Sequence, residues 1–324
     1  MNNNVLNHKN MPDEKTEEQL QKFVEEQESG ETPQVGPKIT AAPAPKFPHT
    51  RGDDQISMGN QVGWQKLPMN DLPTQGIFYP EGTEVTIRAA TAGEIRHWST
   101  IQEDNVYALD DMLNYILERC AKIKYPNNQL SSWKDIKEVD RFYIILAIRE
   151  YTFVKGENQL QVKTSETTTV NVSKEMIDYI TIDERLMKYY NDEKRCFVLK
   201  FKTGGEIEVT IPSIGVTNYL KNYINRKEQL NQGFDHDFIS YASFVIKDWR
   251  GLSDSTYEKM VLESNSWSIP QISVLTHLKE IFLDAVEPVV KYVDEGGAER
   301  VAPLNFQGGI KSIFLISDPF GELV

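Results

Sequence analysis

The stretch LPTQGIFYPEGTEVTIRAATAGEIRHW, residues 72–98, decides the local fold, because it combines a loop, a strand and the start of a helix. Its first part is rich in residues that control the backbone. Pro73 and Pro80 each fix one φ angle, and Gly76 can adopt conformations that are closed to other residues. Residues 72–82 are therefore predicted to form a shaped loop rather than a helix or a strand.

The second part of the stretch carries two periodic signals. Val85 and Ile87 alternate with polar neighbours, which is typical of a short, half-buried β-strand. Thr91 and Glu94 have the spacing of a capping box, in which each side chain accepts a hydrogen bond from the backbone N–H of the other residue. A helix is therefore expected to begin directly after Thr91.

The order of residues in this stretch resembles the start of the baseplate hub and hub-assembly proteins of T-even-like contractile-tailed phages. The matching positions are Leu72-Pro73, Gly76-Ile77-Phe78-Tyr79-Pro80-Glu81-Gly82, Ile87-Arg88 and Thr91 to Glu94. A second match is similar to a helix of the same family. In the family, this helix starts with Asp, Arg and an aromatic residue, continues with a run of apolar residues, ends with Arg and leads into a hairpin. It reads Asp140-Arg141-Phe142-Tyr143-Ile144-Ile145-Leu146-Ala147-Ile148-Arg149. The resemblance covers residues 67–220, under half of the chain.

One departure from this family concerns cysteine. Its members often carry a CxxC pair in the hairpin after the Asp-Arg helix, whereas residues 163–169, KTSETTT, contain none. The two cysteines of the chain, Cys120 and Cys196, are far apart and lack the spacing of a zinc site. We therefore expect no metal and no cofactor, and a reducing compartment such as the host cytoplasm.

Charge and hydropathy exclude two classes of partner. The chain of 324 residues has a formal net charge of −13, which argues against contacts with nucleic-acid phosphates. No apolar run approaches the length of a transmembrane helix, and the polar residues 1–10 do not resemble a signal peptide. We expect neither a nucleic acid nor a membrane as a partner.

Composition divides the chain into four parts. Residues 1–63 are acidic and rich in proline, and are predicted to be a disordered arm because they cannot bury enough apolar surface to fold. Residues 64–212 are predicted to form an α+β domain with small antiparallel hairpins, and residues 213–295 a mainly helical domain. Residues 296–324 form an apolar C-terminal tail. The expected fold class is α+β.

Apolar periodicity and capping residues predict helices over residues 107–123, 132–150, 217–230, 235–250, 255–263 and 268–292. Pro288 is expected to kink or end the last helix. Hairpins are predicted over residues 151–172, with the turn at Gly156-Glu157-Asn158, and over residues 196–211, with the turn at Thr203-Gly204-Gly205.

The best candidate for catalysis is Asp235-His236-Asp237, with Asp248 downstream. A histidine between two carboxylates could act as a base. Neighbours in sequence do not face each other on a helix, however, and no nucleophile accompanies them, so charges at a helix N-terminus are the favoured interpretation. His97 lacks partners at metal-ligand spacing. No known catalytic motif occurs, and the chain is expected not to be an enzyme.

Two features suggest protein–protein contacts. Phe78 and Tyr79 lie on the loop beside Pro80, and equally fit a core plug or an interface anchor. Residues 311–324 are apolar to the end; they either dock onto their own domain or lie against a neighbour, and the resemblance favours the neighbour. The candidate partner-binding residues are Pro73, Gly76, Phe78, Tyr79, Pro80, Phe314, Leu315 and Phe320.

The resemblance implies a non-enzymatic component or assembly factor of the baseplate hub, present in the host cytoplasm during assembly and then in the tail baseplate of the virion. Its partners would be other tail or hub proteins, including the tape-measure protein. Two alternatives stay open: a transient assembly chaperone for the tape-measure protein that is absent from the virion, and a cytosolic enzyme with an unrecognised site. Large exposed apolar patches would favour the hub component or the chaperone. A deep pocket with perturbed titratable groups favours the enzyme.

Overall fold

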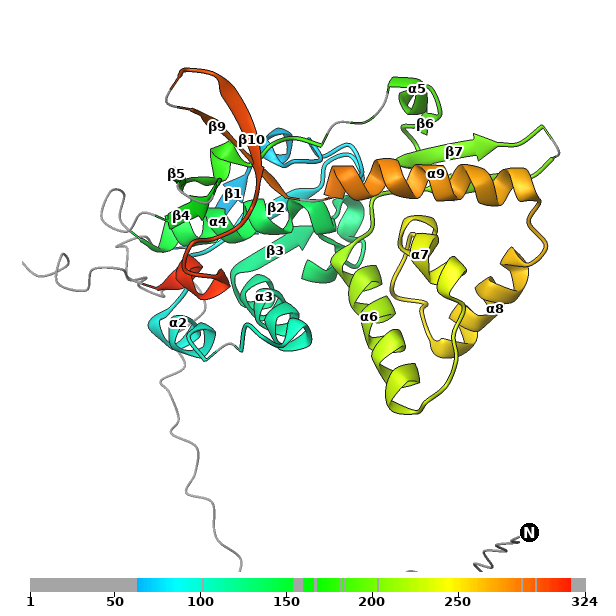
Figure 1. Cartoon of the computed structure of the whole chain (residues 1–324), viewed down its shortest axis with the longest axis horizontal. Helices are drawn as coiled ribbons and strands as arrows, with labels where there is room; N and C mark the ends of the chain where they lie inside the picture. The colour runs from blue at the N-terminus through cyan, green and yellow to red at the C-terminus, as the bar shows by residue number, and fades with distance from the viewer. Residues whose placement is uncertain are drawn as a thin grey trace, which may run out of the picture. The chain divides into compact units, whose positions relative to one another are not determined.

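The computed structural model describes residues 63–315, apart from residues 101, 154–159, 166–167, 181, 183, 203, 287 and 295. The fold is α+β, as predicted, with helices packed against small antiparallel sheets of two or three strands (Figure 1). The predicted arm, residues 1–63, lies outside the described residues except for Gly63. None of the helices in the described ranges has the length and apolar character needed to cross a membrane.

A three-stranded antiparallel sheet organises the first half of the described chain. It consists of β1 (Gln65–Leu67), β2 (Glu84–Ile87) and β3 (Ala121–Lys124), with β2 in the centre. The predicted alternation in β2 is confirmed, since Val85 and Ile87 are buried and pair with Ile123 and Ala121 of β3. Helices α2 (Ala92–Trp98) and α3 (Val106–Cys120) connect β2 to β3, and α4 (Arg141–Thr152) contacts both α3 and β2.

Two hairpins pack with this half. The first pairs β4 (Leu160–Lys163) with β5 (Thr169–Val172), and the second pairs β9 (Val289–Val293) with β10 (Glu299–Pro303). A single β-bridge from Val290 of β9 to Ile177, and another from Phe306, just after β10, to Val162, attach this part of the chain to earlier residues. The chain therefore returns to its first half near its C-terminal end (Figure 1).

The remaining elements form a second group. A sheet of β6 (Tyr190–Asn191), β7 (Cys196–Lys200) and β8 (Glu206–Val209) packs with the helices that follow it. These helices are α6 (Ile214–Gln229), α7 (His236–Val245), α8 (Asp254–Ser264) and α9 (Ile269–Val286), and the short α5 (Glu184–Met187) precedes the sheet. The 3₁₀ helices are η1 (Met69–Asp71), η2 (Pro126–Asn128), η3 (Trp133–Asp135), η4 (Glu138–Asp140), η5 (Lys174–Met176) and η6 (Ile310–Phe314).

The buried apolar side chains form two clusters, here called the first core and the second core. The first core joins β1–β3, α3, α4 and the β4–β5 hairpin to Val290, Phe306 and Phe314 from the C-terminal end. The second core joins the β7–β8 hairpin to helices α6, α7 and α9. The two cores cross the boundaries expected at residues 212 and 295. The β7–β8 hairpin packs with the helices that follow it, and the described part of the tail, residues 296–315, packs with the first half.

Several predicted boundaries are wrong because tertiary pairing overrides local periodicity. The helix expected over 107–123 ends at Cys120, and its last apolar residues form β3. The helix expected over 132–150 is broken. Ser132 caps only the one-turn η3, and the regular helix α4 begins at Arg141. Between η3 and η4, Lys137 pairs with Ser213 through a β-bridge, which holds this part of the backbone extended.

Two further predictions need correction. The hairpin expected over 151–172 is shorter, since α4 continues to Thr152 and the strands begin at Leu160. Its turn lies between residues 163 and 169, and the expected turn at 156–158 falls outside the described residues. The helix expected over 268–292 ends at Val286, and the residues after Pro288 form β9. The sequence analysis missed the β9–β10 hairpin.

Other local predictions are confirmed. Thr91 and Glu94 form both hydrogen bonds of the capping box, at 3.4 Å for the Glu94 N–H and 2.8 Å for the Thr91 N–H. The hairpin over 196–211 forms as expected, and Gly204 and Gly205 take φ angles of 90° and 87° in its turn. These signals depend only on neighbouring residues, so tertiary contacts do not override them.

The Gly215→Ala variant tests the packing of α6. The new methyl group would lie 2.3 Å from Cγ of Trp249, so the indole or the helix must move. We expect the free energy of unfolding, measured by chemical denaturation, to fall by about 1–3 kcal/mol. The matched control is Gly233→Ala, where no atom lies within 4 Å of the added group and a change within about 0.5 kcal/mol is expected. Equal stability of the two variants would contradict this packing.

Candidate functional site

A short segment, residues 135–141, lies between the two cores and is here called the seam segment. Ile136 belongs to the first core and Val139 to the second, so neighbouring side chains point into different cores. The backbone of the segment is also tied to the start of α6. The Ile214 N–H donates to the Ile136 carbonyl at 2.8 Å, and the Glu138 N–H donates to the Pro212 carbonyl at 2.9 Å. The seam segment thus connects both halves of the described chain.

The carboxylate of Asp140 is the centre of a buried polar cluster. It accepts hydrogen bonds from the Thr74 N–H at 2.9 Å, the Thr74 hydroxyl at 2.8 Å and the Tyr79 hydroxyl at 2.6 Å. The Tyr79 oxygen in turn accepts from the Lys137 N–H at 2.8 Å. Asp140, Thr74 and Tyr79 are each at most 1% exposed. The loop of the first motif and the Asp-Arg pair of the second motif therefore meet at this carboxylate.

Burial shifts the ionisation of this cluster. Desolvation raises the pKa of Asp140 from 3.8 to about 6, although the hydrogen bonds from Tyr79 and Thr74 and the charge of Lys137 oppose the shift. Burial also raises the pKa of Tyr79, and the Asp140 charge adds to that effect. Desolvation lowers the pKa of Lys137 to about 8. The cluster is therefore held together by hydrogen bonds at some electrostatic cost.

Arg141, the last residue of the seam segment, forms a second polar network. Its guanidinium donates to the carboxylates of Asp110 at 2.7 Å and Glu138 at 2.9 Å, and to the Asn114 side-chain oxygen at 2.8 Å. Arg141 is 3% exposed, so these acceptors are its main substitute for water. The network fixes α4 against α3.

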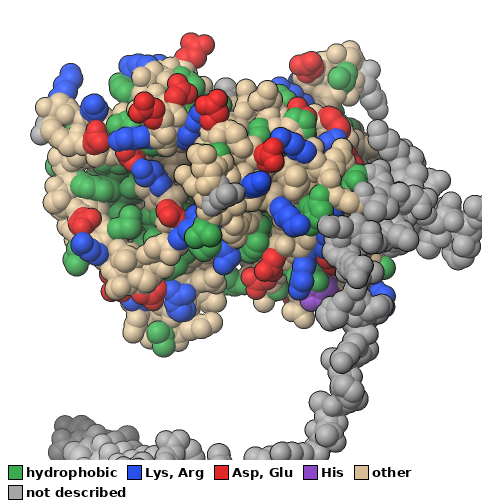
Figure 2. Space-filling view, turned by 180° about the vertical axis from the view of Figure 1, so that it is seen from behind, with side chains coloured by type: hydrophobic (Ala, Val, Ile, Leu, Met, Phe, Trp, Pro, Cys, Tyr) green, Lys and Arg blue, Asp and Glu red, His purple; other side chains and the backbone are tan. Residues whose placement is uncertain are grey.

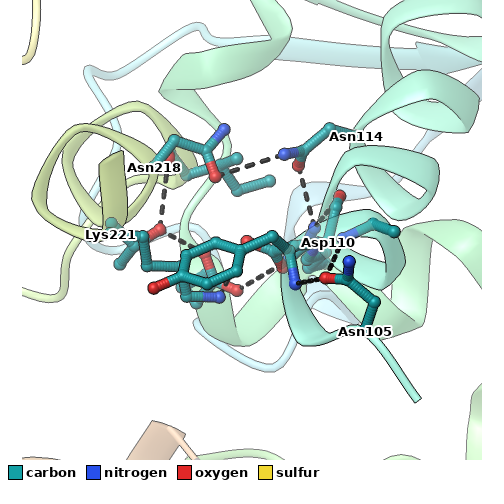
Figure 3. A network of polar contacts seen from close by, with 11 residues as sticks. Asn105, Asp110, Asn114, Asn218 and Lys221 are labelled. Carbon is teal, nitrogen blue, oxygen red and sulfur yellow. Dashed lines mark hydrogen bonds and ion pairs between the residues drawn. The ribbon is translucent and has the colours of Figure 1, made fainter. Parts of the chain in front are cut away.

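The same network reaches α6 (Figure 3). Lys221 donates to the second oxygen of Asp110 at 2.7 Å, and the amide groups of Asn114 and Asn218 are joined at 3.2 Å. Burial alone would raise the pKa of Asp110, but the charges and hydrogen bonds of Arg141 and Lys221 lower it overall. α3 and α6 are thus joined by charged and polar side chains.

A third polar contact fixes the start of the seam segment. The carboxylate of Asp135 accepts from the Trp249 indole N–H at 2.8 Å and from Arg250 at 2.5 Å. It also accepts from the Ser132 N–H at 2.8 Å, which completes a capping box. Because Trp249 packs over Gly215, this contact links η3, the loop after α7 and the start of α6.

The loop residues predicted to bind partners lie inside this protein. Phe78 and Tyr79 are 4% and 1% exposed, and Phe78 packs edge-on against Tyr190 with ring centroids 6.1 Å apart. Pro73 is buried, and Gly76 and Pro80 are half-buried. Gly76 has a φ of 76°, and a Cβ there would lie 3.0 Å from the Met69 side chain. The structure thus decides between the two interpretations: the aromatic pair is a core plug.

The C-terminal candidates behave similarly as far as the structure describes them. Phe314 is fully buried, with its ring 5.0 Å from that of Trp98, and the Trp98 indole N–H donates to the Lys311 carbonyl at 3.2 Å. Leu315 is 41% exposed. Phe320 lies outside the described residues. The first part of the tail therefore docks onto its own domain, contrary to the interpretation that the sequence favoured.

The candidates for catalysis have structural roles in the described residues. Asp235 caps α7 and accepts from the Phe238 N–H at 2.7 Å, as the favoured interpretation predicted. His97 is exposed and its ring lies 4.4 Å from that of Tyr115. Among the described residues, no group of three or more His, Cys, Asp or Glu side chains is placed to hold a metal ion.

A pocket of about 540 Å³ lies beside the seam segment, and the sequence analysis missed it. Lys137 lines the pocket together with Cys196 of β7. The other lining residues are Phe78, Pro80, Glu81, Tyr125, Pro126, Asp192, Glu193, Lys194, Arg195, Thr210 and Lys247. Together with Lys137 and Cys196 they come from six separate parts of the chain, around residues 78–81, 125–126, 137, 192–196, 210 and 247, so no local pattern could indicate them.

Comparisons of the chain with protein-family models, with curated proteins and with solved structures found no match. On the face of the molecule shown in Figure 2, acidic and basic side chains are interspersed with apolar ones.

Titration of Asp140 gives a prediction about pH. Between pH 3.8 and about 6 the folded state retains a proton that the unfolded state has lost, so this group lowers stability as pH rises through that window. We expect the difference in unfolding free energy, wild type minus Asp140→Asn, to decrease by at most about 3 kcal/mol from pH 4 to pH 7. Denaturant melts across that range would measure it. A difference that increases with pH would show that the folded state favours the ionised carboxylate.

Two substitutions around Asp110 separate a buried partner from an exposed one. Arg141→Ala leaves a largely buried carboxylate and amide without their main donor, and we expect a loss of about 3–5 kcal/mol of stability. Lys221 binds the same carboxylate but is 42% exposed, so Lys221→Ala should cost about 1 kcal/mol or less. Chemical denaturation of both variants is the measurement, and similar losses would contradict the assignment of Arg141 as the organising cation.

Proposed function

We propose that this protein is a non-enzymatic component or assembly factor of the baseplate hub of a contractile phage tail, and that it acts through protein–protein contacts. One observation carries the proposal. Asp140 of the second motif accepts a hydrogen bond from Tyr79 of the first motif, and also from Thr74, which lies between matching positions of the first motif. Where the members of a family share one fold, motifs that are distant in sequence are expected to lie together in that fold.

We place the contact surface away from Phe78, Tyr79 and Phe314, because those side chains are buried. The β9–β10 hairpin offers a better candidate. Val293 and Val301 are 63% and 56% exposed, and the ladder register places them diagonally on one face of the hairpin. β9 is already bridged to Ile177 at Val290, so β10 is the edge of this hairpin that could pair with a strand of another chain. We therefore assign the main partner contact to this hairpin.

A second exposed apolar group lies where α8 leads into α9. Leu262, near the end of α8, is 69% exposed, and Ile269, the first residue of α9, is 84% exposed. Apolar side chains at such exposure leave surface that a partner can remove from water. These residues support contacts of more than one kind, as a component of an assembly requires.

The chaperone alternative uses the same surfaces, since exposed apolar residues serve a permanent neighbour and a transient client equally well. The enzyme alternative is favoured by one observation, the pocket that contains Lys137 with its lowered pKa. The second potential nucleophile of this pocket, the thiol of Cys196, does not favour the enzyme alternative. Burial raises the pKa of the Cys196 thiol, which opposes formation of a reactive thiolate.

The experiment that tests the proposal is mass spectrometry of purified virions of the phage that encodes the chain. We expect its peptides at a few copies per particle, or, for the chaperone alternative, only in infected-cell lysate in complex with a tail protein. Absence of the protein from both virions and tail-protein complexes would contradict the proposal.

The role of the hairpin is tested in the same preparation with the Val293→Glu, Val301→Glu double variant. Both side chains are exposed, so the variant should fold, while a charge on that face should reduce incorporation or complex formation at least tenfold, about 1.4 kcal/mol. The matched control is Leu130→Glu, at an apolar residue that is 85% exposed elsewhere on the surface. Equal loss in both variants, or no loss in the first, would contradict the assignment of the hairpin.

A further inference from the structure

The pocket beside the seam segment has an apolar part and a charged part. The rings of Phe78, Pro80, Tyr125 and Pro126 supply apolar wall, and Thr210, directly after β8, also lines the pocket. Lys137 lies in the same pocket and is 8% exposed. A pocket with apolar walls and a few fixed polar groups is the usual form of a small-ligand site.

The ammonium of Lys137 is incompletely paired. It has three N–H donors, and within the described ranges it makes one hydrogen bond, to the Ile211 carbonyl at 3.0 Å. Among the described residues it forms no ion pair, and the carboxylates of Asp140 and Asp135 act on it only through their charge at longer range. A buried cation with only a neutral acceptor is costly unless an anion joins it.

The other cations of the pocket already have partners. Lys194 donates to Glu208 at 2.5 Å, and Lys247 binds the other oxygen of the same carboxylate. Arg195 lies 3.7 Å from Glu81 and 4.0 Å from Asp192, both highly exposed. Lys194 also lies 3.6 Å from Glu206, so these two lysines share two carboxylates. Among the described residues, Lys137 is therefore the cation of the pocket that lacks an ion-pair partner.

From this geometry we propose that the pocket binds a carboxylate carried on an apolar body, with the carboxylate paired to the Lys137 ammonium and the body against Phe78, Pro80 and Pro126. A single ammonium matches one carboxylate better than a phosphate, which is bound most often by arginine forks or clusters of backbone N–H groups. The ligand is a free organic acid or the C-terminal residue of a peptide. This inference goes beyond the proposed function and does not depend on it.

Binding should be linked to protonation. Desolvation lowers the pKa of Lys137 to about 8, and a bound anion would raise it again, so binding near pH 8.5 should take up a proton. The charged and titratable groups around Lys137 are Asp135, Asp140, Tyr79, Tyr125, Cys196, Lys194, Arg195, Lys247, Glu81, Asp192 and Glu193. Of these groups, Asp140 has a pKa of about 6, and burial raises the pKa of Tyr79, Tyr125 and Cys196. Lys137 is therefore the expected proton acceptor near pH 8.5.

The test is calorimetric titration of the full chain at pH 7 with four probes. N-acetyl-L-phenylalanine represents the end of a peptide, and 3-phenylpropanoate represents a free acid with the same ring. N-acetyl-L-phenylalaninamide is the uncharged control, and inorganic phosphate tests for a different anion. We expect both carboxylates to bind and the amide and phosphate to bind at least about tenfold more weakly, as the loss of one charged hydrogen bond implies. The stronger of the two carboxylates identifies the source.

The variant is Lys137→Met, which keeps the length of the side chain and removes its charge. It should weaken carboxylate binding at least about tenfold, whereas Lys259→Met, at an exposed lysine of α8, should not change it. If Lys137→Met does not fold, titration of the wild type at pH 8.5 in two buffers of different ionisation enthalpy replaces it, with uptake of up to one proton expected. Binding of the amide as tight as that of the acid, preference for phosphate, unchanged affinity in Lys137→Met, or no proton uptake would each overturn the proposal.

Discussion

The carboxylate of Asp140 is buried and takes its hydrogen bonds from a loop that lies more than sixty positions earlier in the chain, at Thr74 and Tyr79. A buried carboxylate is tolerated only where donors surround it. The conformation of the seam segment therefore depends on the conformation of the loop. The order of Pro73, Gly76 and Pro80 provides that shape. The Tyr79 hydroxyl extends the contact to the backbone of Lys137. The relative placement of the loop, η4 and α4 follows from this one carboxylate.

The two cores depend on that placement because the seam segment contributes to both. Ile136 enters one core and Val139 the other, and Arg141 then joins α3, η4 and, through Asp110, α6. Buried ion pairs add little net stability compared with apolar packing, but they are directional and penalise other arrangements. The polar seam therefore acts mainly on the relative arrangement of the two halves, while the apolar clusters supply most of the stabilisation. The pocket is a product of the same arrangement, since its wall combines the loop, the seam segment and the β7–β8 hairpin.

How much of this the sequence could predict depended on the range of each interaction. The capping box at Thr91, the cap at Asp235 and the 196–211 hairpin are set by near neighbours and were predicted. The strands β3 and β9 were assigned to helices, because their apolar residues continue a helical pattern and only pairing with distant strands makes them extended.

The candidate site was harder to predict than the fold. The sequence identified Tyr79 and Asp140 as parts of motifs but not as partners, and it placed Phe78 equally in a core or an interface. Lys137 carried no signal, since its burial arises from Ile211 and from loops that are remote in sequence. Charge and periodicity describe a residue's neighbours along the chain, whereas a perturbed lysine is defined by its neighbours in space.

We infer that the loop of the first motif is part of the architecture and does not open to contact partners. Amide hydrogen exchange at Thr74 and Lys137 tests it most directly, because these N–H groups donate to Asp140 and to Tyr79 within the cluster. We predict that both amides exchange only through global unfolding, with the protection of the central strand β2. Exchange at the rate of an exposed loop, while β2 stays protected, would contradict the claim and would return the loop to the candidate contact surfaces.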